Sequence, residues 1–161
     1  MIFMRTASFT ATITLVIGLL FLGGILYVLI GPTTTSTFAG ESDIDLTITG
    51  GELDNLFGFG DLDNELSAPG PTITIKNGQI VKIIFENIGE IPHTFRISDG
   101  NTTDSTILFN ASIGDNSNPI APGQLSTVTF QAEKSGTFHY ICSIPGHADR
   151  GMIGIIIIED E

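Results

Sequence analysis

Residues 137–152 read TFHYICSIPGHADRGM, a short alternating strand pattern that leads directly into a loop. The loop carries the only cysteine of the chain, Cys142, and His147 and Met152 follow at intervals of five residues. A thiolate, an imidazole and a thioether on one loop form a soft ligand set that prefers copper. Each residue alone has a plainer interpretation, because a lone cysteine often serves as a small buried hydrophobic residue and methionine fills gaps in cores. The three together, on a loop bent by Pro145, favour a metal site.

A second imidazole is needed to complete a mononuclear site, because blue copper centres use two histidines and one cysteine with a weak axial methionine. His93, in the segment IPHTFRI, is the candidate. Alternate residues of a strand point to opposite faces, so Cys142 shares a face with Tyr140 and not with His139. By the same rule, His93 shares the apolar face of Phe95. Parity therefore admits His93 as a ligand and excludes His139, which we expect to be an ordinary surface residue.

From residue 69 onward the chain shows the pattern of an all-β domain, with short β-branched runs separated by turn signals at regular intervals. Asn77-Gly78 is typical of a two-residue hairpin turn. Ahead of this region, residues 50–60 are rich in glycine and predict a loop, whose Phe57 and Phe59 either cover an edge of the core or are exposed. The expected strands are 43–49, 72–76, 80–86, 93–98, 125–131, 137–142 and 152–159.

A polar insertion, residues 99–121, separates two of these strands and shows no pattern that predicts its fold. It carries two sequons for N-glycosylation, at Asn101 and Asn110. Such acceptors are meaningful only in a domain outside the membrane. The sequons agree with the topology that the N-terminus predicts, but they do not establish it.

The N-terminal part predicts a membrane anchor. Residues 6–40 carry no charge, and the apolar run 9–30 would span ~33 Å as a helix, enough for the hydrocarbon core of a bilayer. A cleaved signal peptide is the alternative, but the run is long for one and the best cleavage site is weak. Arg5 precedes the run and acidic residues follow it, so the N-terminus is expected in the cytoplasm and the remainder outside. The expected segments are a short cytoplasmic N-terminus at 1–8, a single-pass transmembrane anchor in the cell membrane at 9–31, a flexible tether at 32–40 and the folded domain at 41–161.

Two stretches, CSIPGHADRGM and the earlier PGPTITIKNGQIVKIIFEN, together resemble the cupredoxin (blue copper) family. The similarity covers about residues 68–159, and within the family the loop is most similar to those of rusticyanin and sulfocyanin. The resemblance implies a Greek-key β-sandwich that holds one type 1 copper. The implied ligands are His93, Cys142 and His147, with Met152 as the axial ligand.

The resemblance also implies how the surroundings of the metal are built. The backbone amide of Thr94 is expected to donate a hydrogen bond to the sulfur of Cys142. His147 is expected to have an edge near solvent and to serve as the port for electrons. The apolar ring around that edge is expected to consist of Ile144, Pro145, Ala148 and Met152.

The function implied is that of a membrane-anchored carrier of single electrons in an extracytoplasmic respiratory chain, not that of an enzyme. Copper oxidases and nitrite reductases of this fold use several such domains and an HCH motif, whereas Ile141 and Ser143 flank the cysteine here. The binuclear centre of terminal oxidases requires a second cysteine at the position of Gly146. Copper storage or delivery remains the alternative, although such proteins often expose Met- or His-rich ligand sets and this chain has three of each residue. A structural adhesion domain would leave the ligand loop unexplained.

The charge balance restricts the partners. The chain has 18 acidic and 6 basic residues, a formal net charge of −12. Nucleic acid is excluded as a partner, because phosphate binding requires clustered Lys and Arg. The expected partners are redox proteins, either membrane-bound respiratory complexes or soluble electron carriers, that dock through basic or apolar surfaces. Membrane lipid is expected to contact the N-terminal helix.

Overall fold

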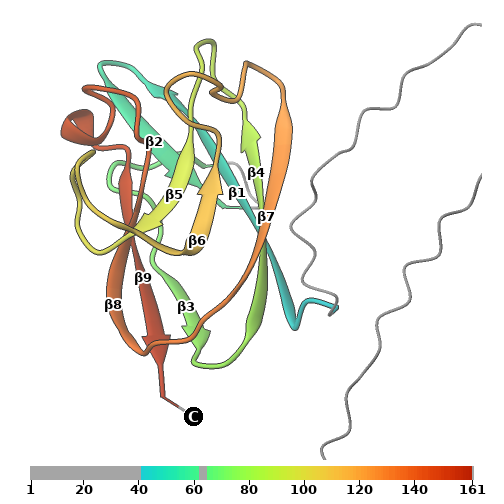
Figure 1. Ribbon diagram of the computed structural model, residues 1–161. Coiled ribbons are helices and arrows are strands. Elements are labelled where there is room, and N and C mark those ends of the chain that lie inside the picture. Colours follow the sequence, from blue (N-terminus) through green and yellow to red (C-terminus); the bar gives the residue numbers. More distant parts are fainter. Residues whose placement is uncertain (1–40, 62–64, 161) are drawn as a thin grey trace, which may run out of the picture. The chain divides into compact units, whose positions relative to one another are not determined.

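Two β-sheets stack face to face in the part of the chain that the computed structural model describes, residues 41–61 and 65–160 (Figure 1). One sheet consists, in spatial order, of β2 (Leu56–Gly60), β1 (Ile44–Leu53), β4 (Ile80–Asn87) and β7 (Leu125–Gln131). The other consists of β3 (Ile73–Lys76), β9 (Ile153–Glu159), β8 (Gly136–Ile141), β5 (Phe95–Ser98) and β6 (Ile107–Ile113). A short 3₁₀ turn, η1 (Ala148–Arg150), connects β8 to β9.

The core between the sheets follows from the alternation of side chains. Along β4, Val81, Ile83 and Phe85 are fully buried, and the residues between them are partly exposed. The ring of Phe85 meets that of Phe95 in the opposite sheet, with centroids 6.1 Å apart. Burial of each large apolar side chain stabilises the fold by about 1.5–3 kcal/mol. The all-β class that the alternation predicts and the β-sandwich that the resemblance implies are both confirmed.

The strands predicted after residue 69 are all present, with bounds that differ by at most two residues. The predicted N-terminal segment 1–8, anchor 9–31 and tether 32–40 lie outside the described residues. Within the described ranges, 41–61 and 65–160, no helix has the length and apolar character needed to cross a membrane.

The prediction of a loop over residues 50–60 is wrong. β1 continues through the first part of this stretch and turns back into β2, which pairs with it antiparallel. The glycines that suggested a loop permit close packing instead. A Cβ at Gly50 would lie 2.8 Å from side-chain atoms of both Met152 and Phe85. Glycine is therefore a packing requirement here, and both aromatic residues of the stretch are buried.

Asn77-Gly78 forms a turn, but not the predicted β-hairpin. β3, before the turn, pairs in parallel with β9, whereas β4, after it, pairs with β1 and β7 in the other sheet. The φ angle of Gly78, 87°, suits the turn. The turn therefore carries the chain from one sheet to the other, because the strands on its two sides find their partners elsewhere in the chain.

The insertion 99–121 contributes β6, which pairs antiparallel with β5. Further along, Ile120 and His93 form an isolated antiparallel bridge. Both sequon residues, Asn101 and Asn110, are exposed. The insertion thus extends the second sheet and supports the residues that lead into β5.

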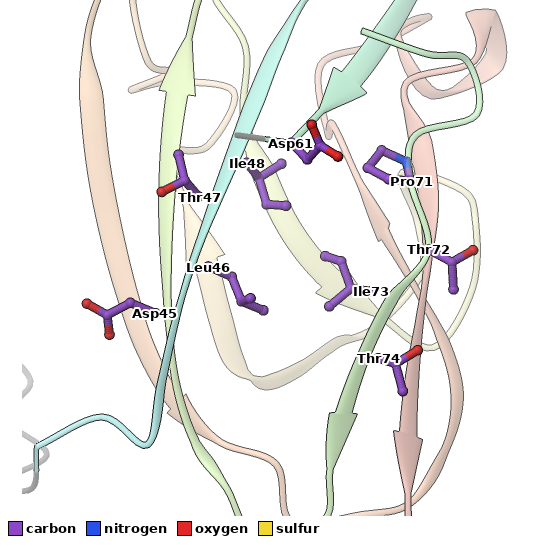
Figure 2. Close-up of a pocket in the computed structure, with 9 residues that line it drawn as sticks. All are labelled: Asp45, Leu46, Thr47, Ile48, Asp61, Pro71, Thr72, Ile73 and Thr74. Atoms are coloured by element: carbon purple, nitrogen blue, oxygen red, sulfur yellow. The ribbon is translucent and has the colours of Figure 1, made fainter. Parts of the chain in front are cut away.

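A groove of about 480 Å³ opens between β1 of one sheet and β3 of the other (Figure 2). Threonines, apolar residues and two carboxylates line it: Asp45, Leu46, Thr47, Ile48, Asp61, Pro71, Thr72, Ile73 and Thr74. None of the predicted metal ligands is among these lining residues, so the groove is separate from the site described next.

Candidate metal centre

The structure brings together His93 from the connection between β4 and β5 and Cys142 and His147 from the connection between β8 and β9. His93 precedes β5, Cys142 follows β8, and His147 immediately precedes η1. The ligand atoms of the three residues lie within 4.8 Å of one another. Nδ1 of His93 is 3.2 Å from Nδ1 of His147. The Nδ1 atom of His147 is 3.5 Å from the sulfur of Cys142. All three residues are buried, with exposed fractions of 0, 0 and 7%.

Met152, the fourth predicted ligand, is fully buried and is tied to this group through its backbone. Its amide donates to the carbonyl of His147 over 3.0 Å. Its carbonyl accepts a hydrogen bond of 3.1 Å from the amide of Cys142. These bonds close the loop and hold Met152 beside the cysteine. The methyl end of the Met152 side chain lies against Gly50, where any Cβ would be only 2.8 Å away.

The donor atoms of the three buried residues suit copper. A cysteine sulfur and two imidazole nitrogens, with a thioether nearby, match the soft His₂Cys set with a weak methionine. The two Nδ1 atoms face each other at a distance that allows only one of them to carry a hydrogen. At least one of them therefore points a lone pair into the space between the donors. The residues present therefore fit a copper ion.

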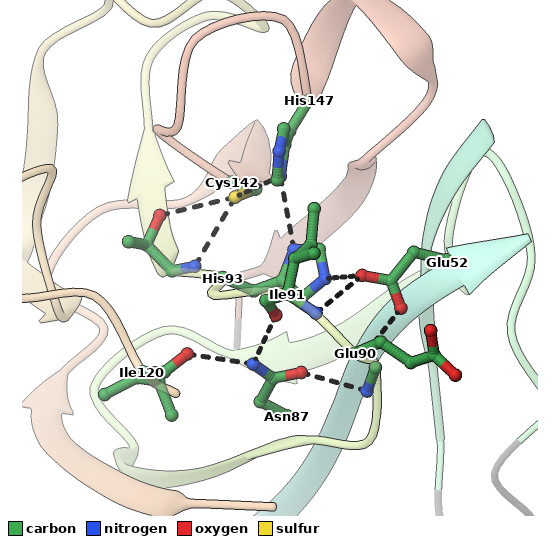
Figure 3. A network of polar contacts seen from close by, with 10 residues as sticks. Glu52, Asn87, Glu90, Ile91, His93, Ile120, Cys142 and His147 are labelled. Atoms are coloured by element: carbon green, nitrogen blue, oxygen red, sulfur yellow. Dashed lines mark hydrogen bonds and ion pairs between the residues drawn. The ribbon is translucent and has the colours of Figure 1, made fainter. Parts of the chain in front are cut away.

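Asn87, the last residue of β4, holds the loop that carries His93 (Figure 3). Its side-chain amide donates to the carbonyls of Ile91 and Ile120, each over 2.8 Å. Its side-chain oxygen accepts a bond of 3.0 Å from the amide of Gly89. Asn87 is fully buried, so water does not compete for these bonds. One side chain thus ties the main chain before the histidine to the segment of the insertion that pairs with it.

Glu52 of β1 contacts the other ring nitrogen of His93 (Figure 3). Nε2 lies 3.1 Å from the carboxylate, which also accepts bonds from the amides of Glu90 at 2.8 Å and Ile91 at 3.1 Å. Burial lowers the pKa of His93 more than the carboxylate raises it, so the ring is neutral. The contact is therefore a hydrogen bond from a neutral N–H, not an ion pair. Burial alone would raise the pKa of Glu52, but the two amides bring it below its usual range.

Thr94 donates two hydrogen bonds to the sulfur of Cys142. Its backbone amide lies 3.4 Å from the sulfur, which confirms the expected contact, and its hydroxyl lies at 3.6 Å. The same hydroxyl accepts a bond of 2.7 Å from the amide of Ser143. Burial raises the pKa of the Cys142 thiol, and the bonds from Thr94 offset only part of that increase. A bound metal ion would have to displace this proton.

Phe57 of β2 covers His147. The two rings are stacked, with centroids 4.0 Å apart and planes at 21°. The guanidinium of Arg150 lies 4.3 Å from the centroid of Phe57 and donates to the carbonyl of Asn55 at 3.1 and 2.6 Å. Burial, with contributions from His93 and Arg150, lowers the pKa of His147 to about 4. At neutral pH the imidazole is therefore uncharged and has a lone pair for a metal.

A hollow of about 290 Å³ lies over His147. Its lining is mostly apolar: Ile91, Pro92, Asn116, Pro119, Ile144, Pro145 and His147. The predicted ring is thus partly wrong. Ile144 and Pro145 line the hollow, but Ala148 and Met152 are buried and belong to the interior. The rest of the lining comes from the loop before β5 and from the insertion, which only the tertiary structure brings to His147.

Three residues that support the metal site were assigned no role there from the sequence: Glu52, Phe57 and Asn87. Two of them left a signal. Asn87 lies in register with the inward residues of β4, such as Phe85, where a polar side chain is unusual. Glu52 likewise has the parity of the inward-facing Ile48 in β1. This parity was not used for Glu52, because residues 50–60 were predicted to form a loop and the alternation of faces applies only within a strand.

His139 lies outside the group, as parity predicts. It is half-buried rather than freely exposed. Its Nδ1 atom is buried and has no hydrogen-bond partner among the residues that the structure describes. The expectation of an ordinary surface residue is therefore only partly correct.

Known proteins share this fold, and some are similar in sequence over more than half of the chain. A family model described as multicopper oxidase matches residues 64–161, which is more than half of the chain. The copper-resistant cuproprotein CopI of Rubrivivax gelatinosus is 28% identical over 54% of this chain and 56% of its own length. A copper-containing nitrite reductase of Alcaligenes xylosoxydans xylosoxydans is 29% identical over 57% of this chain and 27% of its own. Rusticyanin from Thiobacillus ferrooxidans superposes with a TM-score of 0.55 and 24% identity, covering 72% of this chain and 77% of that structure.

These matches differ in what they support. The chain spans just over half of CopI and about a quarter of the nitrite reductase. The likeness to rusticyanin supports the fold alone, and it agrees with the cupredoxin-like sandwich described above. The family match includes His93 and the loop from Cys142 to Met152 and supports the expectation of copper. The chain therefore belongs to the multicopper oxidase family of copper-binding, cupredoxin-like domains.

Proposed function

We propose that this protein carries single electrons by means of one type 1 copper, bound by His93, Cys142 and His147 with Met152 as the weak axial ligand. The observation that carries the proposal is the convergence of three buried donors beneath an apolar hollow. The donors provide a site for a redox ion. The hollow provides a surface where a second redox protein can approach a ligand of that ion.

Bound copper would supply a one-electron couple between Cu(II) and Cu(I). His93 and His147 are neutral and offer ring nitrogens, while Cys142 gives up its proton and binds as a thiolate. The amide and hydroxyl of Thr94 donate to the sulfur and stabilise its negative charge. Asn87 holds the loop of the first histidine without help from a metal. The protein thus prearranges the donors, so that little has to move when an electron arrives.

We propose that electrons pass through the edge of His147 that lines the hollow. Ile91 and Pro145 on the rim are exposed and form part of an apolar contact area. The net charge of −12 favours a partner whose contact area is surrounded by basic residues. Association with such a partner slows as the salt concentration rises, because exposed charges are screened.

We also propose that the protein is anchored in the cell membrane. The uncharged apolar run supports a single-pass helix at 9–31, and Arg5 supports a cytoplasmic segment at 1–8. The tether 32–40 would then connect the anchor to the domain 41–161 on the extracytoplasmic side. Membrane-bound respiratory complexes or soluble electron carriers are the proposed partners.

In this proposal the protein is not an enzyme, although it belongs to a family named for oxidases. Ile141 and Ser143 flank Cys142, where a link to a second copper centre would require histidines. In the described part of the chain, one cluster of at least three metal-binding side chains occurs, and it consists of His93, Cys142 and His147. A single mononuclear centre supports electron transfer without substrate chemistry.

Copper storage or delivery is the second candidate, and the similarity to the copper-resistant cuproprotein CopI favours it. A protein that hands over its metal needs ligands that another molecule can reach. The burial of all three donors argues for retention of the metal instead.

The test is to add Cu(II) to the purified full chain and to record its visible spectrum and its voltammogram. We expect an intense thiolate charge-transfer band and a reversible one-electron wave. Both should be lost in Cys142→Ser and kept in His139→Ala, which removes the histidine outside the group. Rapid transfer of the copper to a chelator without a reversible wave would contradict the electron carrier and support delivery.

A further inference from the structure

We infer that Glu52, which is not a ligand, sets both the tautomer of His93 and the reduction potential of the site. It is a positioning residue, because it acts on a metal only through His93. The second part of the inference rests on the proposed function. The first part concerns the metal-free protein and can be tested on its own.

Glu52 reaches His93 because β1 extends past the end of β4. The parallel pairing of the two strands ends with Gly50 opposite Asn87, so Glu52 lies beside the loop that follows β4. Gly89 in that loop leaves the space for the carboxylate, since a Cβ there would lie 2.3 Å from Oε2. The main chain on both sides thus builds a place for this side chain.

The carboxylate is held by donors from the loop (Figure 3). The amide of Glu90 binds one oxygen at 2.8 Å, and the amide of Ile91 binds the other at 3.1 Å. The second oxygen also faces Nε2 of His93 at 3.1 Å. The side chain is 27% exposed, so most of it is shielded from water. These contacts leave the carboxylate little freedom to turn away from the histidine.

This arrangement determines which ring nitrogen of His93 carries the hydrogen. An ionised carboxylate only accepts hydrogen bonds, so Nε2 must be the N–H that donates to Glu52. Nδ1 then has a free lone pair, and it faces Nδ1 of His147. In the opposite tautomer, a lone pair would face the carboxylate and a hydrogen would occupy the position of a metal. Glu52 therefore prepares His93 as a ligand before any metal binds.

The charge of Glu52 has a separate effect. The amides of Glu90 and Ile91 and the N–H of His93 all donate to the carboxylate, which stabilises its ionised form. A carboxylate that accepts the N–H of a ligand histidine increases the basicity of the ligand nitrogen. Its negative charge, partly shielded from water, also favours the more positive of two oxidation states. Both effects favour Cu(II) over Cu(I) and lower the reduction potential.

Glu52→Gln separates the two roles, because it removes the charge and keeps one acceptor. With its amide oxygen toward Nε2 of His93 and the amide of Ile91, its NH₂ group faces the amide of Glu90, and only that bond is lost. We expect the affinity ratio for Cu(I) over Cu(II) to rise about tenfold, which is about 59 mV in a one-electron potential. Glu90→Gln is the matched control, since it removes the same charge from an exposed side chain of the adjacent loop. Screening by water should limit its effect to less than about twofold.

Glu52→Ala removes the acceptor as well as the charge. In the metal-free protein, ¹⁵N NMR of the histidine rings should show the Nε2–H tautomer of His93 in the wild type and in Glu52→Gln. A mixture of tautomers is expected in Glu52→Ala. Glu52→Asp, whose shorter side chain does not reach the ring, should show the same mixture and serves if the Ala variant does not fold.

Two results would overturn the inference. Equal shifts of the potential in Glu52→Gln and Glu90→Gln would remove the role of the charge, and an unchanged tautomer in the Ala and Asp variants would remove the positioning role. If the wild type takes up no copper, the proposed function fails, while the NMR measurement still decides the role of Glu52 toward His93.

Discussion

Glu52 and Phe57 are cross-strand partners in the β1–β2 hairpin, and each contacts a different imidazole of the site. The carboxylate of Glu52 lies 3.1 Å from Nε2 of His93, and Phe57 stacks on His147 with ring centroids 4.0 Å apart. Phe57 also meets His93 edge-on at 5.9 Å. A hairpin that supplies no predicted ligand therefore positions both predicted histidine ligands.

Phe57→Leu should speed the loss of copper from the loaded protein. The substitution removes a stacked aromatic contact worth about 1 kcal/mol, so His147 is held less firmly and release accelerates about five- to tenfold. Transfer of copper to a chelator, followed by the visible spectrum, measures the rate. Phe109→Leu is the control, because Phe109 stacks on Phe130 and its loss should cost stability but leave the release rate unchanged. Equal release rates in both variants would contradict a specific role for Phe57.

Thr94→Val should lower the reduction potential by tens of millivolts, since it removes the hydroxyl that donates to Cys142 while the backbone amide stays. The donated bond stabilises negative charge on the sulfur, which is greatest in the Cu(I) state. The variant should also lose about 1–3 kcal/mol of stability, because the buried amide of Ser143 loses its acceptor. Voltammetry and urea denaturation measure the two effects. Thr127→Val makes the same substitution at an exposed position of β7 and should shift the potential little. A shift as large as that of Thr94→Val would argue against the sulfur contact as the cause.

The metal-free protein should lose stability as the pH falls from 6.5 toward 4. Burial and neighbouring groups lower the pKa of His147 from 6.5 to about 4, so in this interval the unfolded state binds a proton that the folded state does not. The free energy of unfolding therefore rises with pH across the interval, by at most about 1.4 kcal/mol per pH unit for one group. The lowered pKa of His93 acts with the same sign. Glu52, whose pKa is also lowered, contributes stability that is lost only at pH values below 4.5.

Urea denaturation of the metal-free chain at about pH 5 and pH 7 measures this dependence. His147→Gln should reduce it, because the residue that titrates is gone. His139→Ala removes the half-buried histidine outside the group and is the comparison variant. A dependence that persists unchanged in His147→Gln would show that other groups cause it.

Asn87→Ala should destabilise the domain by about 3 kcal/mol, because it leaves the carbonyls of Ile91 and Ile120 without their buried donor. The loop that carries His93 then loses its main support, so copper affinity should fall as well. Urea denaturation and competition with a chelator measure the two effects. Asn118→Ala, at an exposed position, is the control and should change neither.

Pro145→Glu should slow electron exchange between two copies of the protein about tenfold. The added charge lies at the rim of the hollow, where two acidic molecules would have to approach each other. The spectrum and the potential should stay close to those of the wild type. NMR line broadening in mixtures of oxidised and reduced protein measures the exchange rate. Leu125→Glu adds the same charge at a position that is 57% exposed and is not part of the hollow, and it should have little effect.

The alternation of apolar residues predicted the all-β class and placed six of the seven strands after residue 69 to within two residues, whereas β6, in the insertion, was not predicted. The spacing of Cys142, His147 and Met152 predicted the metal loop, and parity admitted His93. These are local properties, since strand periodicity and the ligands of one loop are set by neighbours in the chain. The same reasoning found the Asn77-Gly78 turn but not the pairing of the strands beside it. Pairing depends on partners that are distant in the sequence.

Only the tertiary structure decided which residues support the metal loop. Glu52 lies 41 residues from His93, and their contact depends on how far β1 runs past β4. Gly50 shows why the sequence alone could not reveal this. A glycine in a sequence indicates either a loop or a position where another side chain packs closely against the backbone. Only the residues that pack against it distinguish the two cases, and at Gly50 these residues are Met152 and Phe85. Local periodicity thus determined the strands and the metal loop, whereas the stacking of two sheets decided what surrounds them.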